Sequence, residues 1–364
     1  MKRIIGYSLL LVLSLACAKT ETVSSNVRAR QVFEAWLQMT YPAAYNNGSQ
    51  GWGWYYHPDE EVPGTGDPVA DSAWVQVRFT ARNMGGTIVE SSEERLHRQI
   101  GDYVNYNYYG PVVWHKADAA ALPAGLRNLL QDMKIGGKRR AFVPGWLNSM
   151  SNYSSAQEYF NDSENAGNSL MYDLEILDAT NDITRWGVDS LVRFVERHTS
   201  CPYAQSKTDV PAGEDRFIRC PESSKDTTSL GFWYQRLKNP DKVKAWPADT
   251  IVYVDYVGRR PDGTVFDTSI RDTARKYDLY SSSATYSPMK MKVAAVFYDS
   301  KMIASDGSES SLINGFTYAV KKMQPGEWGV ALFHQGMGYA QSSQAKIPAY
   351  SPLLFELRLV DAPK

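Results

Sequence analysis

Residues 250–269 read TIVYVDYVGRRPDGTVFDTS. Apolar and polar side chains alternate over residues 250–256, which is the pattern of a strand with one buried face. Pro-Asp-Gly at 261–263 predicts a tight turn, because proline fixes φ and glycine accepts the backbone angles that such turns require. An extended pattern resumes over 264–269. This stretch therefore predicts a β-hairpin.

The same pattern occurs earlier in the chain. Residues 73–92, AWVQVRFTARNMGGTIVESS, again give an alternating strand, a Gly-Gly turn and a second extended run. An aromatic triplet precedes each copy, at 54–56 and at 232–234. The repeats of solenoid proteins are much shorter, so self-similarity on this scale predicts two related domains.

Each copy continues with a matching second half and is preceded by an amphipathic segment. The expected short helices lie at 125–133 and 315–323, the strands that follow them at 135–144 and 325–333, and the closing strands at 170–177 and 353–360. Sequential antiparallel strands with one helix on one face predict an α+β domain. Apolar residues at helical spacing predict a further helix before each copy, at 27–39 and 184–198. Packing of these two helices on the cores is favoured over partner binding.

The first residues carry the signs of export. Lys2 and Arg3 precede an apolar run at 4–15 that is too short to span a bilayer. The tetrapeptide Ser-Leu-Ala-Cys ending at Cys17 resembles a bacterial lipobox, whose cysteine becomes acylated; an ordinary signal peptide with an incidental cysteine is the alternative. Acyl chains on Cys17 would hold the protein at a membrane. We expect a protein of the bacterial cell envelope, lipid-anchored and facing the periplasm or the cell surface.

Composition excludes several other classes. The formal net charge of -1 offers no basic field for nucleic acid. Besides Cys17 the chain has only Cys201 and Cys220, and in an exported protein this isolated pair predicts a disulfide rather than a zinc site. The five histidines are scattered, and the sequence has neither a phosphate-binding loop nor a nucleophile elbow. No cofactor and no metal are expected.

Three segments of the second copy resemble the FKBP-type peptidyl-prolyl isomerase family. Residues 256–269 resemble its hallmark first half, LINGF at 312–316 its pocket floor, and residues 347–357 its closing strand. In the first copy, MKIGGKRR at 133–140 is the closest match. The resemblance implies, in each copy, a curved antiparallel sheet wrapped around a short helix. The chain then divides into a lipoprotein signal at 1–17, a tether and helix at 18–45, a degenerate FKBP-like domain at 46–179, a helix with the disulfide connector at 180–228, and an FKBP-like domain with the more intact pocket at 229–364.

The resemblance also implies a proline-binding pocket in the second copy. Its catalytic groups would be Tyr256, Asp267 and Tyr339. Its walls would be Phe266, Leu312, Ile313, Phe316, Ile347 and Phe355, with Met289 as a further candidate. Phe316 replaces the tryptophan that the family usually has in the floor. The segment 270–311 is longer than is usual in the family, and it could shape the pocket or plug it.

The first copy departs from the family at most of these positions. Phe79 stands for the tyrosine, Val89-Glu90 for the Phe-Asp pair and Leu126 for the floor aromatic, while the position of the loop tyrosine falls near Ser149. Tyr172 keeps the aromatic of the closing strand. These departures predict a retained fold and a lost pocket.

The implied function is isomerisation of X-Pro bonds in exported proteins by the second copy, with proline-containing or partly folded polypeptides as partners. A non-catalytic chaperone or scaffold of the same fold is the alternative. From the residues alone, Phe266 and Phe355 could be plain core, and Asp267 could cap a turn. A third possibility is glycan binding through exposed aromatics, for which Trp52, Trp54 and Trp233 are the candidates.

Overall fold

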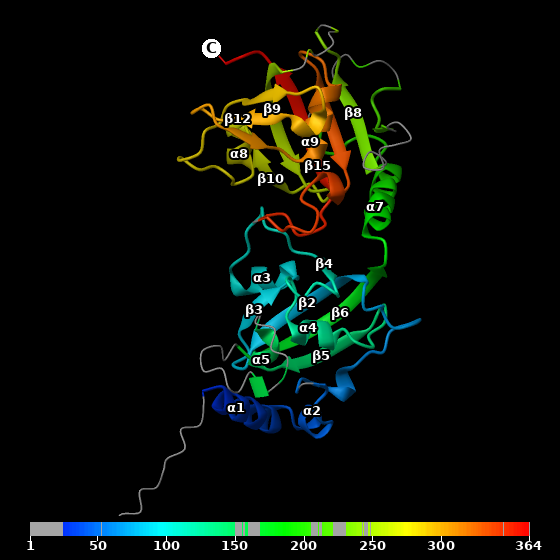
Figure 1. Cartoon of the computed structure of the whole chain (residues 1–364), viewed down its shortest axis with the longest axis vertical. Helices are drawn as coiled ribbons and strands as arrows, with labels where there is room; N and C mark the ends of the chain where they lie inside the picture. Colours follow the sequence, from blue (N-terminus) through cyan, green and yellow to red (C-terminus); the bar gives the residue numbers. More distant parts are fainter. Residues whose placement is uncertain are drawn as a thin grey trace, which may run out of the picture.

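The structure is a computed structural model of the chain. It describes residues 25–51, 53–149, 155, 157–158, 168–204, 210, 213–220, 231–241, 243, 247, 249–344 and 346–363. The predicted signal segment with Cys17 lies outside these residues, as does Trp52. Two antiparallel sheets, each with its own hydrophobic cluster, form the framework of the described chain (Figure 1).

The first sheet has the strand order β1-β5-β6-β2-β3, and β4 also pairs with β2. Its longest pairing joins β2 (Trp74–Asn83) to β6 (Leu170–Thr180). The other strands are β1 (Tyr55–Tyr56), β3 (Ile88–Ser91), β4 (Val112–His115) and β5 (Lys138–Val143). The helices of this half are α1 (Ser25–Thr40), α2 (Pro42–Asn46), α3 (Glu94–Ile100), α4 (Ala124–Leu129), α5 (Gly145–Asn148) and the 3₁₀ turn η1 (Pro58–Glu60).

The second sheet has the order β13-β12-β11-β9-β15-β14-β8-β7, and β10 also pairs with β9. Its strands are β7 (Ile218–Arg219), β8 (Phe232–Lys238), β9 (Thr250–Arg259), β10 (Val265–Thr268), β11 (Met289–Val293), β12 (Lys301–Ile303), β13 (Glu309–Ser311), β14 (Trp328–Phe333) and β15 (Leu353–Val360). The helices of this half are α7 (Ile183–Arg197), α8 (Arg271–Lys276) and α9 (Asn314–Lys322), with 3₁₀ turns η3 (Phe297–Asp299) and η4 (Gln335–Met337).

The two sheets follow one plan, as the repeat in the sequence predicts. The order β8-β14-β15-β9 with β10 and β11 in the second sheet corresponds to β1-β5-β6-β2 with β3 and β4 in the first. Strands β12 and β13 are additions that come from the long segment 270–311. The α+β class is confirmed, and the predicted hairpin is the pair β9–β10.

The second sheet is covered on both faces. On one face α9 buries Phe316, Ala319 and Val320 in a cluster with the aromatic residues of β8, β14 and β15. On the other face Leu191 of α7 lies in a separate cluster with Trp233. In Figure 1, α7 lies below the lower end of β8. Phe33 and Leu37 of α1 are likewise buried in the first core. Both helices that precede the copies, α1 and α7, therefore pack on hydrophobic cores, as the sequence analysis favours.

The predicted disulfide between Cys201 and Cys220 is wrong, because the two cysteines are not joined. Cys201 is buried in the cluster beneath α7, together with Trp233 of β8. Cys220 packs against the cluster on the opposite face of the sheet, which holds Phe232. Since side chains of adjacent strand residues point to opposite faces, the sheet itself separates the two sulfur atoms.

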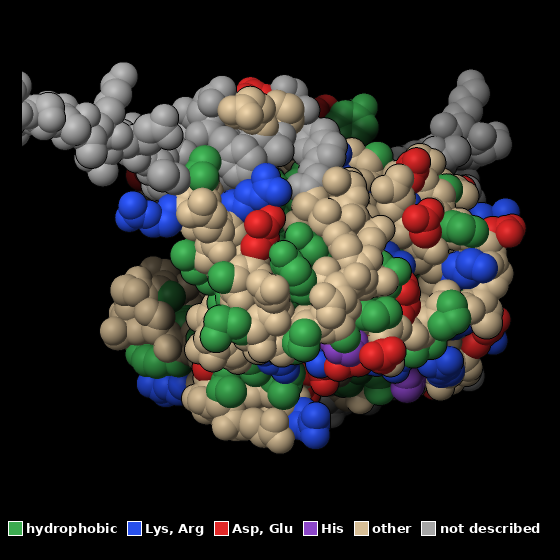
Figure 2. All heavy atoms as spheres, turned by 90° about the horizontal axis from the view of Figure 1, so that it is seen from below, with side chains coloured by type: hydrophobic (Ala, Val, Ile, Leu, Met, Phe, Trp, Pro, Cys, Tyr) green, Lys and Arg blue, Asp and Glu red, His purple; other side chains and the backbone are tan. Residues whose placement is uncertain are grey.

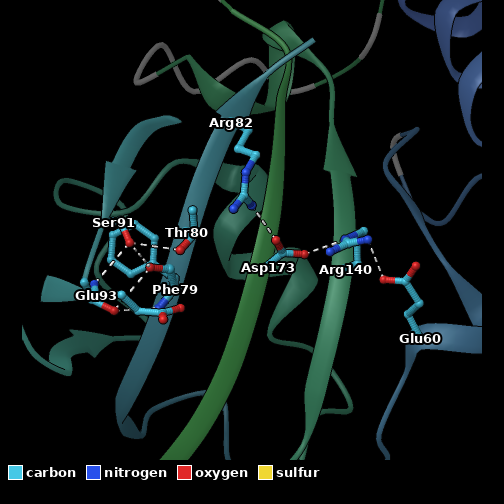
Figure 3. Close-up of polar contacts among 9 residues, drawn as sticks. Glu60, Phe79, Thr80, Arg82, Ser91, Glu93, Arg140 and Asp173 are labelled. Atoms are coloured by element: carbon cyan, nitrogen blue, oxygen red, sulfur yellow. Dashed lines mark hydrogen bonds and ion pairs between the residues drawn. The ribbon is translucent and has the colours of Figure 1, made fainter. Parts of the chain in front are cut away.

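The surface agrees with a chain of nearly balanced charge. On the outer face of the first sheet, Asp173 lies between Arg82 and Arg140, each 2.5 Å away, and Arg140 also reaches Glu60 at 2.6 Å (Figure 3). Figure 2 shows acidic and basic side chains interspersed on the face seen from below. Among the described helices, none is long and apolar enough to cross a membrane.

The glycan-binding alternative loses two of its three candidates in the structure. Trp54 is only 6% exposed and Trp233 only 4% exposed, and each belongs to a hydrophobic cluster. Neither indole presents a flat face on which a sugar ring could stack.

Candidate active site

The candidate site is built on the β9–β10 pair. Opposite Gly258 on β9 lies Asp267 on β10, directly after a bulge in the pairing. The hydroxyl of Tyr256 donates to Asp267 Oδ2 at 2.8 Å, and Asp267 Oδ1 accepts from the backbone N–H of Thr268 at 2.8 Å. Asp267 therefore accepts hydrogen bonds both from the phenol of Tyr256 and from the next backbone N–H of its own strand. The backbone N–H of Tyr256 donates to Ser269 Oγ at 2.9 Å, which fixes the base of this side chain.

Four aromatic rings from three strands and the helix lie edge to face beside this pair. The centroids of Tyr256 and Phe316 are 5.8 Å apart at an interplanar angle of 89°. Phe266 and Phe355 are 5.6 Å apart at 80°, and Phe316 and Phe355 are 5.3 Å apart at 90°. Such arrangements place the positive edge of one ring on the negative face of the next. They give a rigid apolar wall next to a carboxylate.

Gly258 makes room for two of these rings. A Cβ atom at this position would lie 2.6 Å from the ring of Phe266 and 3.0 Å from the ring of Phe355. A glycine inside a strand often marks a close approach of this kind. Any larger residue would displace the rings that form the wall.

An open cavity of about 610 Å³ lies against Tyr256, Phe266 and Asp267. Residues of the 270–311 segment, among them Tyr286, Met289 and Met302, form its opposite side. The additional segment thus lengthens the sheet and lines the cavity without filling it. Met289, on β11, lies in the lining, although its placement from the sequence was open.

The structure brings all nine predicted side chains of the pocket to this place. Tyr256, Phe266 and Asp267 line the cavity. The other six belong to the same cluster beside it: Phe316, Ile347 and Phe355 are buried, and Leu312, Ile313 and Tyr339 are partly buried. Sequence reasoning missed Gly258 and the cavity residue Lys346. The glycine inside an alternating strand was a usable signal, whereas nothing local marks the lysine.

The ionisable groups influence one another. Burial and the neighbouring Asp267 carboxylate raise the pKa of Tyr256 well above its ordinary value. Burial and the same carboxylate also raise the pKa of Tyr339. Both phenols therefore keep their protons at neutral pH and can donate hydrogen bonds. Among the described residues, no group of three His, Cys, Asp or Glu side chains is placed to hold a metal ion.

Comparison with known proteins agrees with this geometry. Residues 243–360 match the family model described as FKBP-type peptidyl-prolyl cis-trans isomerase. This part of the chain belongs to that family. The match spans the whole candidate site, from β9 to the end of β15, and the family assignment rests on it.

Three solved structures illustrate what the chain is similar to. The three FKBP domains of wheat FKBP73 are 16% identical over 85% of this chain and 94% of that one, with a TM-score of 0.29. FkpA from Escherichia coli is 17% identical over 42% of this chain and 58% of that one, with a TM-score of 0.28. A peptidyl-prolyl cis-trans isomerase from Pseudomonas syringae pv. tomato is 18% identical over 51% and 99%, with a TM-score of 0.29.

The first sheet has the framework of the FKBP-type site without its chemistry. Phe79 occupies the position of Tyr256, because its backbone N–H donates to Ser92 Oγ at 2.9 Å as that of Tyr256 does to Ser269. Figure 3 shows Phe79 on β2 with its neighbours Thr80 and Ser91. Phenylalanine has no hydroxyl, so the counterpart of the tyrosine–carboxylate pair cannot form here.

The neighbouring positions of the first sheet also differ. Ala81 and Glu90 are paired as Gly258 and Asp267 are in the second sheet, so a methyl group takes the place that the glycine leaves open. The hydroxyl of Tyr172, the counterpart of Phe355, donates to Asn148 Oδ1 at 3.3 Å. This tyrosine is thereby engaged within its own domain.

Proposed function

We propose that the FKBP-type domain catalyses cis–trans isomerisation of X-Pro bonds in exported polypeptides and that the first domain does not. One observation carries the proposal: the Tyr256–Asp267 pair borders an aromatic wall and a cavity that the 270–311 segment leaves open. A plugged pocket would instead favour a non-catalytic scaffold. The family match of residues 243–360 supports the same reaction class.

The chemistry needs no covalent intermediate. Rotation about an X-Pro bond is slow because amide resonance gives it double-bond character, with a barrier of about 18–20 kcal/mol. The twisted amide loses most of its charge separation, so a water-poor apolar wall favours it over the planar ground state. The rings of Phe266, Phe316 and Phe355 would hold the prolyl ring while the carbonyl before it turns.

The polar groups around the wall would hold the flanking chain. Tyr339 keeps its proton, and its hydroxyl is available for a substrate carbonyl. In the described part of the chain the backbone N–H of Ile313 donates to no protein acceptor, while its carbonyl oxygen accepts from Phe316 and Thr317 as α9 begins. Asp267 would face the rotating amide and keep Tyr256 in place through their hydrogen bond.

The place of action is proposed from the sequence alone. The Lys-Arg start, the short apolar run and the Cys17 motif support export and a lipid anchor in the bacterial envelope. The substrates would then be proline-containing chains that fold outside the cytoplasm. Mass spectrometry of the protein from a bacterial membrane would show a diacylated or triacylated Cys17 at the new N-terminus; an unmodified chain that starts elsewhere would contradict the anchor.

A proline-isomerisation assay on the full chain in mild detergent tests the proposed activity. We expect the wild type to accelerate isomerisation of a proline-containing peptide, and Asp267→Ala to lower kcat/KM by at least tenfold. Glu90→Ala is the matched control, since it removes the equivalent carboxylate from the first domain and should leave the rate unchanged. A folded but inactive wild type that still suppresses aggregation of an unfolded protein would favour the chaperone alternative.

A further inference from the structure

A tyrosine-rich loop of the first domain, residues 102–111 with the sequence DYVNYNYYGP, has a shape of its own. The rings of Tyr103 and Tyr109 stack with centroids 5.2 Å apart, and the backbone N–H of Val104 donates to the Tyr109 hydroxyl at 2.9 Å. At the base, His97 Nδ1 lies 2.9 Å from Asp102 Oδ1. These contacts hold the loop before any partner is met.

This loop reaches the second domain, as Figure 1 shows where the cyan segment after α3 meets the red segment between β14 and β15. The contact centres on Arg260, whose side chain is only 4% exposed. Its Nη2 donates to the carbonyl oxygen of Asn107 at 3.0 Å, and its Nη1 donates to the carbonyl oxygen of Lys346. Its guanidinium also lies 5.0 Å from the ring of Tyr108. A buried guanidinium requires hydrogen-bond acceptors, and the carbonyl oxygens of Asn107 and Lys346 supply them, so this contact between the domains is specific.

The loop also touches the wall of the active cavity. The ammonium of Lys346 lies 4.9 Å from the ring centroid of Tyr106 and donates to the carbonyl oxygen of Phe266 at 3.3 Å. Both Lys346 and Phe266 line the cavity, and Asp267 follows Phe266 directly. A second tie joins Asn105 Nδ2 to the Asp278 carboxylate at 2.5 Å. The lysine therefore links a ring of the first domain to the strand that carries the catalytic carboxylate.

We propose that Tyr106 of the first domain is a positioning residue of the isomerase site: by holding Lys346 against Phe266, it fixes one wall of the catalytic pocket. This inference rests on the proposed isomerase function and deepens it. The first domain then has a task in catalysis although it has no pocket residues of its own. The separated second domain would retain the chemistry with a looser wall.

The test compares variants of the full chain by kcat/KM on a proline-containing peptide. Tyr106→Leu removes the ring, and we expect a two- to five-fold loss, which corresponds to about 0.5–1 kcal/mol for a cation–π contact of this kind. Tyr106→Phe keeps the ring and should retain wild-type activity. Lys346→Met should lose at least as much as Tyr106→Leu, and the double variant should lose no more than Lys346→Met alone.

A matched control is Lys322→Met, because Lys322 lies 4.5 Å from the ring of Tyr318 in a pair of the same kind within the second domain. It should leave kcat/KM unchanged, and all variants should unfold near the wild-type temperature. An active protein in which Tyr106→Leu matches the wild type, or in which Tyr106→Phe loses as much as Tyr106→Leu, would overturn the positioning role alone. Additive losses in the double variant would overturn it too. A folded wild type without activity would overturn both proposals.

Discussion

Replacing Gly258 by alanine tests whether the aromatic wall depends on one missing side chain. The added Cβ would lie 2.6 Å from the Phe266 ring, closer than carbon atoms approach, and 3.0 Å from the Phe355 ring, which is tighter than most such contacts. Overpacking of this kind costs about 1–3 kcal/mol. For a domain of this size, roughly 3–6 °C of unfolding temperature correspond to 1 kcal/mol. We therefore expect the second domain to unfold about 3–18 °C lower, with a loss of isomerase activity.

The physical cause is checked by a double-mutant cycle with Phe266→Val. Because Phe266 is buried, its truncation alone should cost about 2–4 kcal/mol. In the double variant the smaller side chain makes room for the new methyl group, so the combined cost should fall short of the sum by about 1–2 kcal/mol. Calorimetry of the full chain measures each step. Leu359→Ala is the control, because Leu359 lies two inward-facing positions beyond Phe355 on β15. Its free-energy cost should add to that of Gly258→Ala without coupling. Additivity of Gly258→Ala with Phe266→Val would refute the reasoning.

Three further outcomes are expected. Tyr256→Phe keeps the ring and loses only the hydrogen bond to Asp267. We expect kcat/KM to fall by roughly five- to tenfold, while the free energy of unfolding changes by less than about 1 kcal/mol. Unchanged activity in the peptide assay would contradict this expectation. Burial raises the pKa of Tyr108 to about 12, above the ordinary value near 10. The contact that Tyr108 makes between the domains should therefore weaken as the pH rises from 10 through 12. The difference in alkaline absorbance between the wild type and Tyr108→Phe should titrate near 12, not near 10. Cys201 and Cys220 should both be alkylated in the unfolded chain without reductant; labelling that requires prior reduction would restore the disulfide.

The sequence predicts the parts of the site that short segments encode. The alternation over 250–256 and the Pro-Asp-Gly turn specify the hairpin on which Tyr256 and Asp267 meet, because both the pleat and the turn are local properties. Helix α4 shows the limit of such reasoning. The sequence predicts this helix over 125–133, but it ends at Leu129. Asp132 adopts a φ of 63°, a left-handed conformation that a helix cannot contain.

What the sequence could not supply depends on contacts between distant segments. The spacing of Cys201 and Cys220 says nothing about which face of the sheet each one meets, and the disulfide prediction failed for that reason. Lys346 lies in a polar loop without a motif, and its side chain contacts Phe266 and Tyr106, of which Tyr106 belongs to the other domain. Long-range partners of this kind leave no periodicity in either segment.

The two copies also show that the strand framework forms without the side chains of the pocket. Phe79 and Tyr256 share the same backbone hydrogen bond to a serine hydroxyl, so the strand pair forms with or without the phenol. Restoring the hydroxyl at position 79 would therefore not restore a pocket. The methyl group of Ala81 occupies the place where Gly258 admits two rings, and Val89 offers no ring to place there. The proposed chemistry depends on a coupled set of side chains, whereas the strand framework forms without them.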